Sequence, residues 1–133
     1  MLYDINKLNN LRFYSKVYFH GHSVGGTNPS LLEAMSSGAF ICAHKNIFNE
    51  AILETDAHYF TTEDEVAEVV ATVDKNHSSI VSKVSNNLLK INKLYLWPTI
   101  IDKYIEHFEM IWVNSKSTIT ENSLRLRNQQ LIQ

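Results

Sequence analysis

Apolar and polar positions along the first half of the chain predict strands and helices in alternation. Residues 17–19 are β-branched or aromatic, which is typical of a strand, and residues 39–43 form the unbroken apolar run of a strand buried in a parallel sheet. A helical pattern over 29–37 lies between them, so these segments predict a βαβ unit with a right-handed crossover. We expect a short helix over 48–53 and a third, short strand over 58–60.

The helix over 29–37 has one apolar and one polar face. At about 100° per residue, its apolar residues share one arc and its polar residues the other. The apolar arc holds Leu31, Leu32, Ala34 and Met35, and the polar arc holds Pro29, Ser30, Glu33, Ser36 and Ser37. We therefore expect the Glu33 side chain to point away from the core.

Four more helices are predicted outside this unit, besides the short one over 48–53. Apolar residues at helical spacing, with Asp4 as a cap, predict a short helix ahead of the first strand. Thr62 and Glu65 fit a capping box, in which each residue satisfies a free N–H group of the other, and they open a helix. The apolar pattern predicts the last two helices over 78–94 and 97–113.

The last of these helices begins at Trp97-Pro98, a helix-start signal, and is amphipathic. Its apolar side chains lie within about 120° of one another: Trp97, Ile101, Tyr104, Ile105, Phe108, Ile111 and Trp112. This stripe is typical of a core or domain-packing surface; acids on the opposite face argue against the alternative, a helix on an anionic membrane. From 114 onward the sequence is mostly polar. We therefore expect a main domain over 1–113 and a poorly ordered tail over 114–133.

The segment 20–38 contains all four glycines and one of the two prolines. Glycine costs backbone entropy, so this concentration predicts a loop whose backbone approaches something closely. Asn28 caps the following helix, Pro29 suits its first position, and Gly38 ends it. A strand, a glycine loop and a helix N-terminus with unpaired first-turn amides predict a phosphate site, with the Glu33 carboxylate one turn further on. The alternative is a tight turn that binds nothing.

The same segment resembles the donor-binding motif of retaining glycosyltransferases of family four. Their usual pattern is Glu, seven residues, Glu, Ala-Met and a glycine; here Glu33-Ala34-Met35 and Gly38 match the second half, and Gly25 replaces the first glutamate. The whole run 20–35 is similar to a bacterial rhamnosyltransferase-like subfamily that also lacks this glutamate. Weaker likeness at 47–50 and 95–97 extends the resemblance over about residues 3–112. It implies an α/β fold: the later half of a Rossmann-like donor domain.

The resemblance also implies roles for individual residues. Glu33 would hold the ribose hydroxyls of a nucleotide-diphospho-sugar. The groups facing the donor sugar and diphosphate would be the amides of Gly25, Gly26, Thr27 and Asn28, with Ser30 near the helix mouth. His20 and His22 would take part in catalysis in place of the missing glutamate. No cofactor and no metal are implied.

The resemblance further implies partners and a cellular setting. The acceptor would be a saccharide or lipid-linked saccharide, in surface polysaccharide assembly at the cytoplasmic face of the inner membrane. The chain would also need a missing N-terminal portion of the enzyme and would be inactive alone.

Blander roles stay open for the same residues. Glu33 can be a solvated helix residue, and His20 a structural histidine at a strand end. His20, His22 and His44 together suggest zinc only weakly, because their spacing does not fix the third ligand. The chain as a whole can be a non-catalytic nucleotide-sugar-binding module or a subunit that completes the sheet of a separate chain.

Composition excludes several classes of protein. The chain has 133 residues, 44% of them hydrophobic, a net charge of −2 and one cysteine, Cys42. The length suits one domain, and the charge provides no basic field for nucleic acid. A lone cysteine suits the cytoplasm. We expect no signal peptide and no membrane span, because the first residues lack the required charge pattern and the apolar runs are short.

Overall fold

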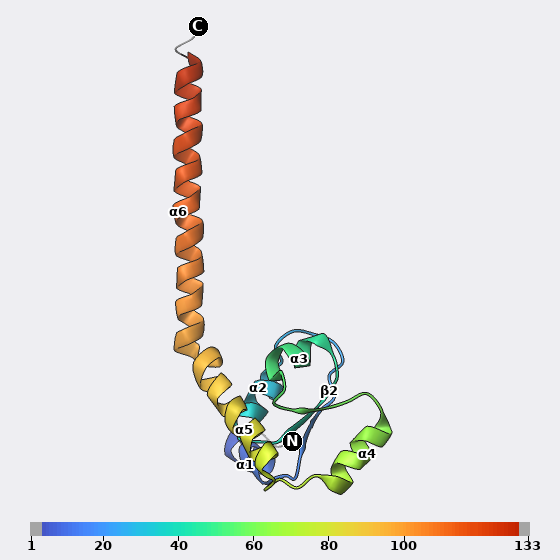
Figure 1. Ribbon diagram of the computed structural model, residues 1–133. Helices are drawn as coiled ribbons and strands as arrows, with labels where there is room; N and C mark the ends of the chain where they lie inside the picture. Colours follow the sequence, from blue (N-terminus) through green and yellow to red (C-terminus); the bar gives the residue numbers. More distant parts are fainter. Residues whose placement is uncertain (1–3, 131–133) are drawn as a thin grey trace. The chain divides into compact units, whose positions relative to one another are not determined.

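The computed structural model describes the backbone of residues 4–130 and the side chains of residues 4–115. The chain divides into two compact units, which meet between Tyr95 and Leu96. This boundary differs from the predicted one at 113. Figure 1 shows the elements of both units along the chain.

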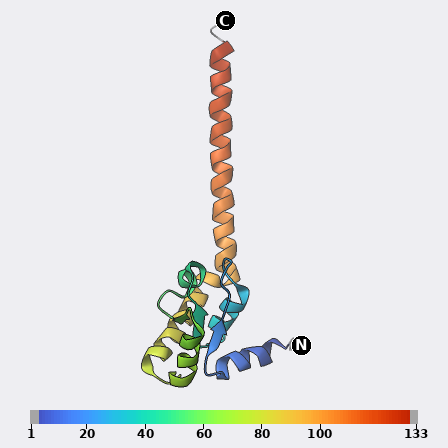
Figure 2. The same ribbon diagram turned by 90° about the vertical axis from the view of Figure 1, so that its right-hand side faces the viewer.

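The first unit is an α/β unit built on a parallel sheet, as the sequence predicts. Three parallel strands lie in the order β1-β2-β3. Tyr18 of β1 lies opposite Ile41 of β2, and Cys42 of β2 lies opposite His58 of β3. The elements are α1 (Ile5–Tyr14), β1 (Tyr18–His20), α2 (Pro29–Ser36), β2 (Ile41–His44), α3 (Ile47–Leu53), β3 (His58–Phe60), α4 (Glu63–Thr72), α5 (Ser78–Lys90) and η1 (Ile91–Tyr95). Helices α1 and α4 lie well apart in both views of this unit (Figures 1 and 2).

Local capping explains where several helices begin. Asp4 accepts hydrogen bonds from the amides of Asn6 and Lys7 at the start of α1. The predicted capping box of Thr62 and Glu65 opens α4 and is confirmed. The helix predicted over 78–94 is interrupted, because its last turn, η1, is a wider π-helix.

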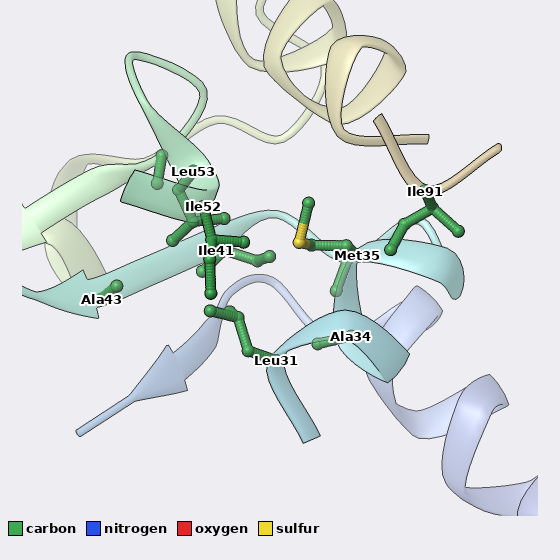
Figure 3. Close-up of a cluster of buried hydrophobic side chains, with 10 residues drawn as sticks. Leu31, Ala34, Met35, Ile41, Ala43, Ile52, Leu53 and Ile91 are labelled. Atoms are coloured by element: carbon green, nitrogen blue, oxygen red, sulfur yellow. The ribbon is translucent and has the colours of Figure 1, made fainter. Parts of the chain in front are cut away.

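The core lies between α2 and the sheet (Figure 3). Leu31, Ala34 and Met35, from the predicted apolar face of α2, are fully buried. They pack in one cluster with residues of β2, α3 and η1: Ile41, Ala43, Ile52, Leu53 and Ile91. Gly38 follows α2 in a left-handed conformation with φ of 72°, where glycine is favoured, and so turns the chain into β2.

The second unit contains helix α6 (Trp97–Gln130), which has 34 residues. It begins at the predicted Trp97-Pro98 signal. It does not end at 113 as predicted but continues to Gln130, so the predicted tail begins inside the helix. Among residues 4–130, none of the helices combines the length and the hydrophobicity that a membrane span requires.

Candidate functional site

The glycine loop, residues 21–28, connects the carboxyl end of β1 to the first turn of α2. Gly25 has φ of 112°, a conformation that L side chains rarely adopt. A Cβ atom added at Gly21, Gly25 or Gly26 would meet nothing within 4 Å. The space on the Cβ side of each of these glycines is open, so a ligand could approach the backbone of this loop from outside.

The first turn of α2 has fewer free N–H groups than predicted. Pro29 has no N–H group, the Ser30 amide donates to Oδ1 of Asn28 at 2.9 Å, and the Leu31 amide donates to the Asn28 carbonyl at 3.0 Å. The prediction of unpaired first-turn amides is therefore wrong, because Asn28 caps the helix with both its side chain and its carbonyl. The Ser30 hydroxyl also donates to Asn28 Oδ1, at 2.8 Å.

The loop before the helix retains free donors. Within the described part of the chain, no hydrogen bond is made by the main-chain N–H groups of Gly25, Gly26, Thr27 and Asn28. These groups precede the positive end of the α2 dipole. The loop, rather than the first helical turn, is therefore the part of this segment with donors left for an anion.

A shallow pocket of about 230 Å³ lies between the glycine loop and α3. Its lining contains no charged side chain: Gly26, Thr27, Ile47, Phe48, Ala51 and Ile52. Ligand pockets usually measure about 300–1,000 Å³. This pocket is large enough for part of a ligand, such as one ring, and has an apolar surface for it.

Glu33 lies on the outer face of α2, as the helical pattern predicts, and pairs with a residue that the pattern does not reveal. Its Oε2 accepts from Arg12 of α1 at 2.8 Å, while 48% of the Glu33 side chain is exposed. Arg12 is only 7% exposed, donates to Asn9 Oδ1 at 3.1 Å, and lies 5.9 Å from the centre of the Tyr18 ring. Arg12 thus orients the Glu33 carboxylate from the buried side of this pair.

His20 and His22 lie side by side at the end of β1. Their rings stack with centroids 4.8 Å apart. Burial, with a smaller contribution from the charge of His22, lowers the pKa of His20. His20 is 2% exposed, and its Nε2 has no hydrogen-bond partner among the described residues. A neutral His20 can donate or accept one hydrogen bond but adds no charge to the site.

Two asparagines that the sequence reasoning overlooked hold this end of the sheet together. The side-chain amide of Asn49 donates to the carbonyls of His22 (3.2 Å) and His44 (2.8 Å), and that of Asn46 donates to the same two carbonyls at 2.9 and 3.3 Å. The Asn46 side chain also accepts from the Phe48 and Asn49 amides and so caps α3. An asparagine cap could be read from the sequence; its bridge to the glycine loop could not.

The structure groups some of the predicted residues and separates others. The glycine loop and both histidines share the carboxyl end of β1, whereas Glu33 contacts Arg12 and does not line the pocket beside the loop. Among the side chains that the structure describes, no three histidine, cysteine or acidic groups lie close enough together to hold a metal ion.

Comparisons with protein-family models, curated proteins and solved structures found no match to this chain. The likeness to glycosyltransferases therefore depends on the residues of the glycine segment and its weaker extensions alone.

Proposed function

We propose that this chain contributes the donor-binding part of a retaining, metal-independent glycosyltransferase. Its donor would be a nucleotide-diphospho-sugar such as dTDP-rhamnose, and its acceptor a saccharide or lipid-linked saccharide. The observation that carries the proposal is the row of free main-chain N–H groups at Gly25, Gly26, Thr27 and Asn28, in front of a capped helix. Such donors suit the charge that develops on a departing diphosphate.

Glu33 has a defined part in this proposal. Its carboxylate would accept hydrogen bonds from the ribose hydroxyls. Arg12 supports this role because it holds one carboxylate oxygen and fixes the direction of the group, while the half-exposed side chain stays within reach of a ligand. The apolar pocket beside the loop would contact one ring of the donor.

We expect the chain alone to bind a donor without transferring its sugar. The pocket beside the loop has no charged lining residue, and a neutral His20 cannot replace a carboxylate in charge stabilisation. The basic residues that grip the diphosphate together with the loop amides, and the groups that hold the acceptor, would come from a further portion of the enzyme.

Calorimetric titration of the chain with nucleoside diphosphates and the corresponding nucleotide sugars tests the proposal. We expect saturable binding, weakened at least tenfold, or about 1.4 kcal/mol, by Glu33→Ala. The matched control is Glu68→Ala, which removes an exposed carboxylate from α4 and should leave affinity unchanged. No saturable binding of any of these ligands by the wild-type chain would refute a donor site.

The second candidate is a non-catalytic subunit that completes the sheet of another chain. It is favoured by the free edge of β1, where the parallel register turns the Phe19 N–H and carbonyl away from β2 and 36% of Phe19 is exposed. A chain with this function alone should bind no nucleotide in the titration above.

A further inference from the structure

Helix α6 carries a broad apolar stripe. Taking 100° per residue, the stripe covers an arc of about 140°. We call these residues the α6 stripe: Trp97, Ile100, Ile101, Tyr104, Ile105, Phe108, Ile111 and Trp112. All except Ile100 are exposed, by 49–75%. Within the residues described, α6 is the single element of its unit, so no other helix or strand of that unit packs over the stripe. A contiguous apolar surface of this kind marks an interaction site.

The spacing within the stripe is that of a helix that packs against another helix. Five of its residues follow one another at intervals of four, three, four and three: Trp97, Ile101, Tyr104, Phe108 and Ile111. This alternation keeps the side chains on one seam when two helices coil around each other. The next positions in the same register, Ser115 and Thr118, are small and polar, so the apolar seam covers about two heptads.

Charges flank the stripe asymmetrically. On the helical wheel, Asp102 and Glu109 follow one border of the stripe, whereas Lys103 and His107 follow the other. When copies of one helix pack in parallel around a common axis, the first flank of each copy faces the second flank of its neighbour. The acidic flank, at b positions of the heptad, then approaches the basic flank, at c and g positions. Antiparallel packing would bring like flanks together instead.

We propose that α6 is a self-association helix, which packs in parallel against α6 of a second copy of this chain and buries the α6 stripe. The alternating intervals of three and four residues place the apolar side chains on one seam, and the flanking charges favour the parallel orientation. An arc wider than a two-stranded seam also accommodates a third or fourth helix. This association does not depend on sugar-nucleotide binding.

The molecular mass of the full chain in solution tests the proposal. In sedimentation equilibrium at 1–100 µM we expect a multiple of the 15.3 kDa chain mass. Phe108→Asp should raise the concentration for half-association at least tenfold. Val113→Asp is the matched control: Val113 is as exposed as Phe108 (63%) but lies on the outer face and away from the basic flank, so this variant should associate at least as well as the wild type. Circular dichroism checks that both variants remain helical.

Two results would overturn the proposal. One is a monomeric wild-type chain at 100 µM, which would leave the stripe to a membrane surface or an unrelated protein. The other is an assembly that Phe108→Asp and Val113→Asp weaken equally, because association would then use another surface.

Disulfide trapping tests the parallel orientation separately. Ile111→Cys, at one end of the seam, should form a disulfide between two copies under mild oxidation, whereas Met110→Cys should not. An antiparallel pair would place residue 111 opposite residue 97 of the other copy, out of reach of its own counterpart. Cys42 does not interfere, because it is fully buried and burial raises the pKa of its thiol to about 11. An assembly that Phe108→Asp disrupts but Ile111→Cys fails to cross-link would contradict the parallel arrangement.

Discussion

Helices α2 and α6 carry the same kind of apolar stripe but are surrounded differently. In α2, Leu31, Ala34 and Met35 are fully buried against the sheet. In α6, Tyr104 and Phe108 are 60% and 63% exposed. An amphipathic pattern therefore predicts a helix and the face that it can bury, while the partner that covers this face comes from the rest of the fold or from another molecule.

The largest expected difference between the two helices is in the unfolding free energy that is lost when one apolar side chain is truncated. Met35→Ala removes packing from the centre of the core and should cost about 2–5 kcal/mol of unfolding free energy. Ile105→Ala, on the exposed stripe of α6, should change the stability of the first unit by less than about 0.5 kcal/mol.

The measurement should follow the first unit alone. Both tryptophans of the chain belong to the second unit, so their fluorescence does not report on the sheet. Urea unfolding followed through the NMR amide signals of β2 gives the required free energy. Equal effects of the two substitutions would mean that the α6 stripe is part of the same core.

A smaller loss of unfolding free energy is expected from a substitution at Gly38, which ends helix α2. Gly38→Ala should cost about 1–2 kcal/mol, because a φ of 72° is unfavourable for alanine; the added Cβ would lie in ordinary contact, 3.4 Å from the Phe13 ring. Gly26→Ala is the control: its Cβ would meet nothing within 4 Å, and its φ lies outside the left-handed region. The same urea experiment reads both variants, and a costlier Gly26→Ala would contradict this account of the loop.

The smallest expected effect is a loss of stability of the first unit at mildly acidic pH. Burial, more than the charge of His22, lowers the pKa of His20 in the folded chain below its unfolded value of about 6.5. The unfolded chain therefore binds the proton first. The stability that comes from neutral His20 is complete above pH 6.5 and is lost as the pH falls from there toward the lowered pKa.

Substitution of His20 and of His58 separates the contributions of these two residues to the loss of stability at acidic pH. Burial, followed by the nearby Lys83, also lowers the pKa of His58. Urea unfolding between pH 5 and 7.5 should thus show a shallower loss for His20→Leu and for His58→Gln than for the wild type. A slope unchanged in His20→Leu would show that this imidazole is not held neutral by the fold.

Local residues determined most of the elements of the chain. Asp4, Asn28 and Thr62 cap their helices as predicted, because a cap needs only a side chain and amides two or three residues away. The three short strands and the buried face of α2 follow from their patterns in the same way. The pairing of the first-turn N–H groups of α2 is also local, because the Ser30 and Leu31 amides donate to the predicted cap, Asn28.

Only the tertiary structure decided which distant groups meet. Arg12 and Glu33 are 21 residues apart and pair because α1 and α2 are neighbours, and Asn49 reaches His22 because β1 and β2 end at the same edge of the sheet. The sequence carries no local signal for either contact, since each partner's own neighbours are compatible with many other placements. Burial is decided in the same way: a periodic apolar face gains its stabilisation only when another apolar surface removes it from water.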